Sequence, residues 1–120
     1  KRTIEKRIAL NIDMAPTILN LVGLNVPTPM QGVDLLAKRS PEREAFFYEH
    51  TFMGSPRLPQ IEGVVQKDIK YMKFIEHGYE QLYDLKKDPL EKINVAKDAR
   101  YTKDLKKLQE QYLILKKAVK

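Results

Sequence analysis

The 120-residue sequence contains no cysteine. This absence excludes disulfide bonds and zinc sites built on thiolates, but it says little about the compartment, because many exported proteins also lack cysteine. No apolar run approaches the roughly 18 residues needed to cross a bilayer. No charged-then-apolar leader follows Lys1. We therefore expect a chain without a membrane partner, from which whatever preceded Lys1 has been removed.

Positive charge exceeds negative charge, with 22 Lys and Arg against 16 Asp and Glu and a net charge of +6. Such a balance is typical of proteins that bind a polyanion, either nucleic acid or a sulfated glycan. Many of the basic residues, however, lie between Lys97 and Lys120 among apolar residues at helical spacing, which favours the solvated face of an amphipathic helix. We therefore expect no nucleic-acid partner.

The first forty residues predict one short helix. Asp13 is a good N-cap, Pro16 falls in the first turn where its missing N–H costs nothing, and Gly23 supplies a left-handed stop. The residues between them are apolar nearly all round, which predicts burial on more than one side. An irregular connection follows over residues 25–32. The polar run 38–43 is the expected boundary to the next structural layer.

Beyond this boundary the pattern predicts strands and one long helix. Segments rich in aromatic or alternating apolar residues are expected to be strands, at 45–52, 61–66, 69–76 and 81–85. His77 and Gly78 suit a tight turn, and Pro89 ends the sheet. With Asp98 as its cap, a helix is predicted from one apolar stripe at alternating spacings of four and three, formed by Tyr101, Leu105, Leu108, Tyr112, Leu115 and Val119.

Two segments carry a resemblance to a known family. Residues 11–24 read NIDMAPTILNLVGL and are followed by PMQG at 29–32, and residues 78–96 read GYEQLYDLKKDPLEKINVA. The first resembles the D-x-A-P-T-h-h-x-h-x-G … M-Q-G segment (h apolar) of formylglycine-dependent sulfatases, which belong to the alkaline-phosphatase-like superfamily. The second resembles their E-L-Y-D-L-x-x-D-P-x-E-x-x-N-L-A segment. Together the two cover most of the chain, which therefore looks like the C-terminal region of a sulfatase.

The resemblance implies an α+β fold with two parts. Residues 41–120 would be the C-terminal subdomain, a four-stranded antiparallel sheet packed by a long C-terminal helix. Residues 1–40 would be the tail of the large α/β domain, including its last short buried helix. Without that domain, the apolar surface of residues 1–40 predicts that the isolated fragment self-associates as a homo-oligomer.

The resemblance also implies a function that this chain does not perform alone. The family's Cys-x-Pro-x-Arg nucleophile motif is absent because there is no Cys, and no position matches the family's metal ligands. Formylglycine and calcium would then belong to the missing N-terminal domain. The implied function is the non-catalytic C-terminal region of a sulfatase that hydrolyses sulfate esters of a sulfated carbohydrate, in a periplasmic, secreted or lysosomal location.

Glu49 and His50 are the candidate substrate-binding residues. In sulfatases the corresponding strand lies where the two domains meet, and its end can reach the substrate pocket. Neighbouring residues of a strand point to opposite faces, so at most one of the pair lines a given cleft unless the strand end is bulged. The alternative is structural, with Glu49 paired to a Lys or Arg and His50 donating one hydrogen bond. His77 is expected to be an exposed turn residue, and Asp13 a cap rather than a metal ligand.

One departure and two alternatives limit the functional inference. Relatives often read E-G-V-R-T, whereas this chain has Val65 in place of the Arg, which leaves the specific sulfated sugar open. The first alternative is a phosphonate or phosphate monoester hydrolase of the same superfamily. The second is a free-standing basic module that binds a polyanion such as a sulfated glycan.

Overall fold

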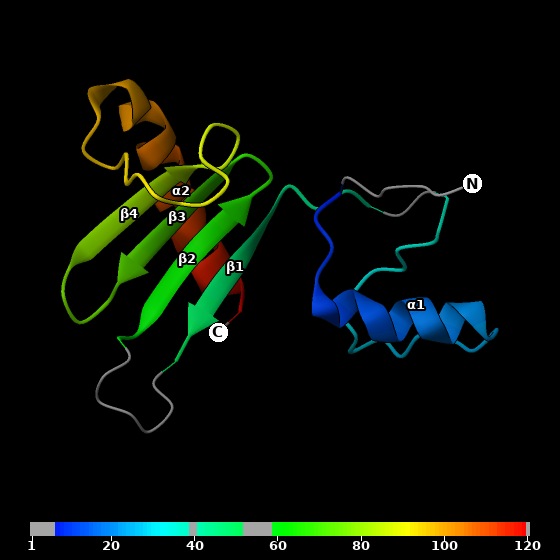
Figure 1. Ribbon diagram of the computed structural model, residues 1–120. Coiled ribbons are helices and arrows are strands. Elements are labelled where there is room, and N and C mark those ends of the chain that lie inside the picture. The colour runs from blue at the N-terminus through cyan, green and yellow to red at the C-terminus, as the bar shows by residue number, and fades with distance from the viewer. Residues whose placement is uncertain (1–6, 39–40, 52–58, 120) are drawn as a thin grey trace. The chain divides into compact units, whose positions relative to one another are not determined.

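The computed structural model describes residues 7–38, 41–51 and 59–119 (Figure 1). The chain divides into two compact units, Lys1–Arg43 and Glu44–Lys120. The sequence places its boundary at almost the same point, between residues 40 and 41. In the described ranges no helix has both the length and the apolar character that a bilayer span requires.

The first unit contains the short helix that the sequence predicts. A 3-10 turn, η1, spans Asn11–Asp13 and runs into α1, which spans Met14–Leu21. Pro16 lies in the first turn of α1 and is buried. The chain then leaves the helix through Gly23, whose φ of +75° is the left-handed conformation that glycine adopts without strain.

The expected burial of this helix is not provided by the described part of the chain. Pro16 is the buried residue of α1, whereas Ile18 is 54% exposed and Leu21 is 71% exposed. Met14 and Val22, at the two ends, are exposed as well. The prediction of burial on more than one side is therefore wrong within this unit, because no element described in it covers the apolar sides of α1.

The second unit is built on the expected antiparallel sheet. Its strands are β1 (Ala45–His50), β2 (Ile61–Gln66), β3 (Ile69–Phe74) and β4 (Tyr79–Asp84), hydrogen-bonded in the order β1-β2-β3-β4. The α+β fold class is thereby confirmed.

The largest difference from the predicted strands lies at the turn between β3 and β4. β3 ends at Phe74 rather than at residue 76, because the amide of His77 donates to the carbonyl of Phe74 and closes a turn. Gly78 has a φ of +58°, which lets the chain enter β4 two residues earlier than expected. His77 is exposed in this turn, as predicted.

The last element is the predicted long helix. A 3-10 turn, η2 (Ala99–Tyr101), leads into α2 (Thr102–Ala118). Asp98 caps this start, since its carboxylate accepts the amide N–H of Arg100 at 2.9 Å. The stripe predicted to pack on the sheet does so through Leu108 and Tyr112, both buried, while Val119 at its end is 58% exposed.

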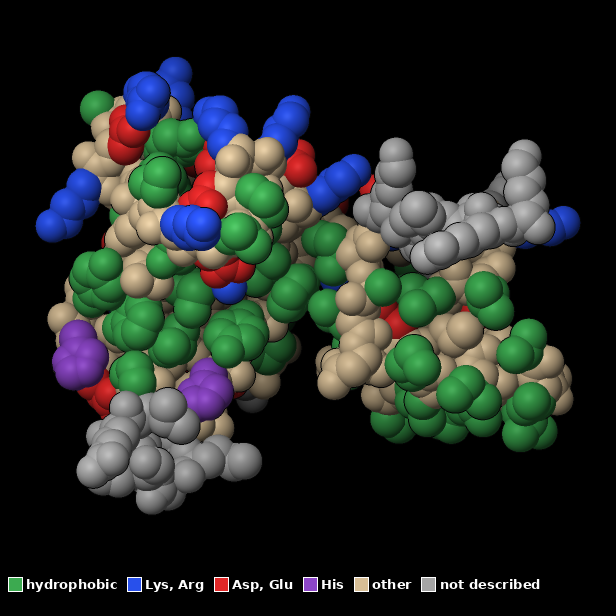
Figure 2. All heavy atoms as spheres, in the orientation of Figure 1, with side chains coloured by type: hydrophobic (Ala, Val, Ile, Leu, Met, Phe, Trp, Pro, Cys, Tyr) green, Lys and Arg blue, Asp and Glu red, His purple; other side chains and the backbone are tan. Residues whose placement is uncertain are grey.

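The core of the second unit lies between the sheet and α2. It consists of Val64, Tyr71, Leu82, Leu108 and Tyr112, each at most 4% exposed. In Figure 1 α2 passes behind the sheet, and Figure 2, drawn from the same side, shows hydrophobic side chains gathered on the sheet face opposite α2. The sheet therefore has one face closed by its own helix and a second face that is also apolar.

Candidate functional site

The structure separates Glu49 and His50 onto the two faces of the sheet, as the alternation of β1 predicts. Phe47 stacks on the ring of Tyr112 from α2, with ring centroids 6.0 Å apart, so Glu49, two residues further on, lies on the helix-covered face. His50 lies on the opposite face. A cleft that reaches the end of β1 from one side therefore meets only one of the two side chains.

Glu49 does not have the structural partner that the alternative interpretation gives it. Within the described residues it forms no ion pair with a Lys or Arg, and its direct partner on β2 is another carboxylate, Glu62. Facing carboxylates in neighbouring strands repel each other. Glu49 is exposed to solvent, which lowers that cost.

His50 has an unsatisfied ring nitrogen. Among the described side chains, its Nδ1 is the buried polar atom that has no hydrogen-bond partner. Buried polar groups in folded proteins are nearly always paired, so an exception calls for an explanation such as a ligand. The structural alternative, in which His50 donates one hydrogen bond, finds no support at this nitrogen.

The side chains that share a row with His50 are apolar and aromatic. Cross-strand register places His50 opposite Ile61, Ile61 opposite Phe74, and Phe74 opposite Tyr79. The rings of Phe74 and Tyr79 are 5.5 Å apart at a 55° angle. This row runs across the whole sheet at the end where the β3–β4 turn lies (Figure 1).

The most buried charged group of the second unit is one that the sequence does not single out. Glu62 is 3% exposed and accepts hydrogen bonds from the hydroxyl of Tyr112 and from Nζ of Lys116. The hydrogen bond with Glu62 raises the pKa of Lys116 above its ordinary value. Burial, and then the bond to Glu62, raise the pKa of Tyr112. This cluster fastens α2 to β2 and has a structural role.

The sequence predicts part of this cluster, because Tyr112 and Lys116 are four residues apart and therefore lie on one face of a helix. Their acceptor, the carboxylate of Glu62, lies fifty positions before Tyr112 in the sequence. A local sequence pattern does not reveal a contact over that separation.

Asp13 is the centre of the polar contacts in the first unit. It is fully buried, and its carboxylate accepts the amides of Leu10 and Val33 at 2.8 and 2.9 Å. The guanidinium of Arg43 adds two bonds of 2.9 Å, one to each oxygen. The Arg43 hydrogen bonds are the main reason that the pKa of Asp13 lies far below its ordinary value.

The prediction that the Asp13 side chain caps α1 is wrong. Asp13 has helical backbone angles and is the last residue of the η1 turn, so its carboxylate turns back to the amide of Leu10 instead of forward to α1. With four donors on its two oxygens it has no position left for a metal.

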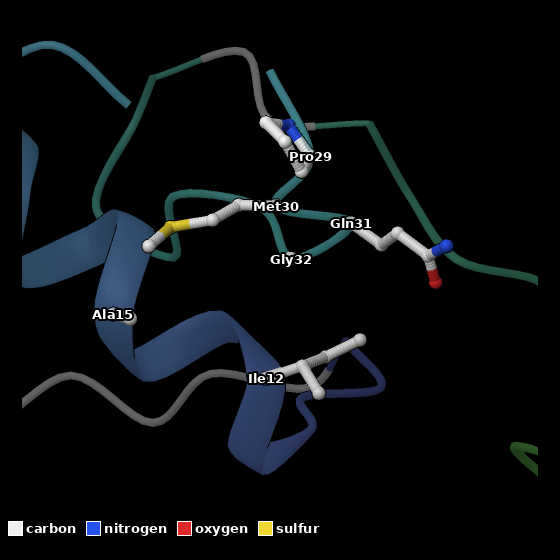
Figure 3. Close-up of a pocket in the computed structure, with 6 residues that line it drawn as sticks. All are labelled: Ile12, Ala15, Pro29, Met30, Gln31 and Gly32. Carbon is white, nitrogen blue, oxygen red and sulfur yellow. The ribbon is translucent and has the colours of Figure 1, made fainter. Parts of the chain in front are cut away.

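The M-Q-G segment lies against the start of α1 around a small hollow (Figure 3). The hollow has a volume of about 330 Å³ and is lined by Ile12, Ala15, Pro29, Met30, Gln31 and Gly32. A side chain at Gly32 would place its Cβ 2.0 Å from the carbonyl oxygen of Ile12, so only glycine fits there. None of these six described lining residues carries a titratable side chain.

The second motif, residues 78–96, makes structural contacts within the second unit. The hydroxyl of Tyr101 donates to Asp84 at 2.7 Å, and this bond is the main reason that the pKa of Asp84 falls to about 2. Asn94 accepts the amide of Leu82 at 3.0 Å and donates to the carbonyl of Glu80 at 3.2 Å. These contacts tie the loop before α2 to the edge strand β4.

Nothing in the described ranges fits the catalytic groups of a sulfatase. There is no cysteine from which formylglycine could be made. No three His, Asp or Glu side chains within residues 7–38, 41–51 and 59–119 lie close enough together to hold a metal ion. The described residues thus offer a candidate binding surface at His50.

Comparison with known proteins identifies the family of this small α+β unit. Residues 1–118 match the model of a family described as N-sulphoglucosamine sulphohydrolase, C-terminal. The chain belongs to this family, and the resemblance seen in its two motifs is confirmed.

Curated relatives are sulfatases of greater length. The chain is 33% identical over 101 residues to a Delta 4,5-hexuronate-2-O-sulfatase of Bacteroides thetaiotaomicron, a match covering 78% of this chain and 21% of the relative. It is 29% identical over 112 residues to an N-acetylglucosamine-6-O-sulfatase of the same species, covering 86% and 20%. An arylsulfatase of Clostridium perfringens is 34% identical over 93 residues, covering 74% and 18%. The chain thus spans about a fifth of the length of these relatives.

Solved structures share the fold. A protein in complex with its substrate D-glucosamine-2-N,6-O-disulfate superposes with a TM-score of 0.73 at 28% identity, covering 88% of this chain and 23% of the other. A 2-O GAG sulfatase gives 0.74 at 29% identity, covering 89% and 24%. The phosphonate monoester hydrolase of Agrobacterium radiobacter gives 0.73 at 27% identity, covering 98% and 26%.

Proposed function

We propose that this chain is the C-terminal region of a sulfatase that hydrolyses sulfate esters of a sulfated carbohydrate. In this proposal the chain completes the fold and rims the substrate pocket, and it is not catalytic alone. The proposal that the chain is not catalytic alone rests on the absence of cysteine from a chain of this family. The sulfated-sugar substrates of the relatives support the choice of substrate class.

The reaction itself requires groups that lie outside this chain. A formylglycine nucleophile and a calcium ion would supply the attacking oxygen and neutralise the sulfate. We place both in a separate N-terminal domain, since the described residues fit neither. A sulfatase of this kind would be exported, in a periplasmic, secreted or lysosomal location.

His50 is the residue that we assign to the substrate. Its Nδ1 is buried and unpaired within the described residues, so a hydroxyl or sulfate oxygen of a sugar would pair with it once the ring turns this nitrogen to the surface. Glu49 rims the other side of the strand end and would contact only a substrate that extends past that end. The two residues therefore have separable roles.

The isolated 120-residue chain is expected to have no sulfatase activity. It contains no nucleophile precursor, and loss of such a group normally removes many orders of magnitude in rate. The measurement is hydrolysis of an aryl sulfate by the purified chain in the presence of calcium. Turnover above that of a heat-denatured control would contradict the proposal.

In an enzyme that contains this chain, His50→Ala is expected to lower kcat/KM for the natural substrate. The loss should correspond to about 1–3 kcal/mol of transition-state stabilisation, the cost of one lost hydrogen bond to a buried group. His77→Ala is the matched control, because His77 is exposed in a turn, and it should leave kcat/KM unchanged. Glu49→Gln should have a smaller effect than His50→Ala. Equal kinetics for folded His50 and His77 variants would show that His50 is structural.

A second candidate function comes from one structural neighbour. The phosphonate monoester hydrolase covers nearly all of this chain, so its activity is the alternative for the whole enzyme. Assays of that enzyme with an aryl sulfate and an aryl phosphonate separate the two. Preference for the sulfate supports the proposed function, and preference for the phosphonate supports the alternative.

A further inference from the structure

A second hollow lies at the edge of the sheet, apart from His50. It has a volume of about 300 Å³, the low end of the range for small-molecule sites. Its lining comes from the β3–β4 turn, the start of β4, the loop before η2 and α2, and consists of Gly78, Tyr79, Glu80, Ala96, Lys97 and Leu105. All of these residues belong to the second unit.

An exposed aromatic ring forms one wall of this hollow. Tyr79 is 45% exposed, and its hydroxyl accepts a hydrogen bond from Nδ2 of Asn94 at 3.1 Å. The ring of Phe74 packs beside it. The ring of Tyr79 is therefore held in place while much of its surface remains open, which is the geometry that a flat apolar face of a ligand requires.

Among the described residues that line the hollow, the positively charged one, Lys97, is unpaired. Lys97 is exposed and forms no ion pair or hydrogen bond with another described residue. Hydrogen bonds from Gln81 and Asn94 lower the pKa of Tyr79, and the charge of Lys97 adds to this effect. The ammonium group and the phenol therefore act on one another across the same hollow.

Glu80, the acid among the described residues that line the hollow, has both carboxylate oxygens occupied. Oε1 of Glu80 accepts the hydroxyl of Tyr71 at 2.6 Å, and Oε2 accepts Nε2 of Gln109 at 2.9 Å. Both donors lie on the α2 side of the sheet, where Glu80 points. Lys97 is thus the charge that an incoming ligand meets, with an open aromatic ring beside it.

We propose that this hollow binds one anionic sugar unit, a sulfated or carboxylated pyranose, with the apolar face of the ring on Tyr79 and the anionic group at Lys97. The site is separate from His50, since Tyr79 lies three strands across the same row, roughly 14 Å away at the usual strand spacing. An oligosaccharide that reaches both would be held at two points. This inference rests on the proposed function in one respect, the choice of an anionic glycan as the ligand.

The test is a titration of the ¹⁵N-labelled 120-residue chain, followed through its amide resonances. The probes are N-acetylglucosamine 6-sulfate, unsulfated N-acetylglucosamine and inorganic sulfate. We expect the sulfated sugar to shift the amides of Gly78, Tyr79 and Lys97, and to bind more tightly than either of the other two probes. Equal shifts from inorganic sulfate would indicate simple anion attraction and overturn the proposal, as would no shift at these amides.

Matched variants separate the site from general attraction to a basic chain. Lys97→Ala should weaken binding of the sulfated sugar by about five-fold, the scale of one exposed charge contact, whereas Lys103→Ala, an exposed lysine of α2 outside the hollow, should not change it. Tyr79→Phe should bind like the parent chain and Tyr79→Ala should not bind. Equal affinity of the Lys97 and Lys103 variants would contradict the assignment. Because turnover is not measured, failure here leaves the His50 kinetics as an independent test of the proposed function.

Discussion

The two units of this chain bury their side chains in different ways. In the second unit, Val64, Tyr71 and Leu82 of the sheet lie beneath Leu108 and Tyr112 of α2, and none is more than 4% exposed. In the first unit the buried described residues are Asp13 and Pro16, and the apolar residues of α1 remain largely exposed. The second unit therefore has a core, and the first is held by the hydrogen bonds around Asp13.

This difference bears on what each unit needs from outside. A unit with a closed core satisfies its apolar surface internally, whereas an exposed apolar helix is stable only when another surface covers it. The curated relatives are several times longer than this chain, which matches 21% of the length of one of them. We infer that the second unit is the self-sufficient part of the chain, and the predictions below address each side of this comparison.

The largest effect is expected from a cavity in the second unit. Leu108→Ala should lower the free energy of unfolding of this unit by about 2–5 kcal/mol, because a fully buried leucine leaves a cavity that its neighbours fill only in part. Leu113→Ala is the matched control on the same helix, since Leu113 is 56% exposed. Urea unfolding of both variants measures the difference. Similar losses for the two would show that α2 does not close the core.

The polar centre of the first unit should respond to the loss of one charge. Asp13→Asn is expected to destabilise this unit by about 1–3 kcal/mol, because the guanidinium of Arg43 loses its anionic partner. Arg43→Lys keeps the charge but not the two-point contact and should give a smaller loss. The Val33 amide donates a hydrogen bond to Asp13, so its rate of hydrogen exchange measures the loss of stability. Unaltered exchange in both variants would contradict the assigned role.

Acid should weaken the first unit through the same carboxylate. The pKa of Asp13 is lower in the folded chain than its ordinary value of 3.8, so its contribution is fully present above that value and is lost as the pH falls from 3.8 toward the folded pKa. The Val33 amide should therefore lose protection in this window. The Asp13→Asn variant should lack that part of the pH dependence, and an unchanged profile would argue against the linkage.

A smaller effect is expected where α2 is fastened to β2. Tyr112→Phe removes one donor from the buried carboxylate of Glu62 and should cost about 1.5 kcal/mol. Because the pKa of Tyr112 is raised on folding, the hydroxyl's contribution is present below its ordinary value of 10.0 and is lost as the pH rises through the folded pKa. Tyr48→Phe, at an exposed site, is the control. Equal alkaline stability of the two variants would contradict the role of Tyr112.

The smallest expected effect is at the start of α2. Asp98→Ala should reduce stability by about 1 kcal/mol, because the amide of Arg100 loses its cap. Asp98→Asn retains a capping oxygen and should stay close to the parent chain. Thermal unfolding followed by circular dichroism distinguishes them, and the cap would be unimportant if both variants matched the parent.

Much of the second unit could be predicted from sequence, because its pattern and its packing agree. The stripe through Leu108 and Tyr112 predicts the helix face that is buried, and alternation in β1 predicts that Glu49 and His50 part to opposite faces. The turn between β3 and β4 was placed too late, since the bond from His77 to Phe74 ends the strand early. The sequence carries a weaker signal for this turn bond than for the alternation of apolar residues in the strand beside it.

The polar sites were harder to predict, because they join residues far apart in the chain. Asp13 has the composition of a helix cap, yet its partners include Arg43, thirty positions away. Glu62 meets Tyr112 and Lys116 only once the sheet and helix have packed. The role of Glu49 and His50 toward a substrate stays a prediction, since it depends on groups outside the chain.

The comparison between the units is tested most directly by self-association. Sedimentation velocity over a range of concentrations would compare the full chain with a version that starts at Glu44. We expect the full chain to associate through its first forty residues, and the Glu44 version to remain a folded monomer. Lysine at both Ile18 and Leu21, which are exposed on α1, should reduce the association. A full chain that stays monomeric at high concentration, with its α1 amides protected from exchange, would show that the first unit needs no outside partner and would contradict the account.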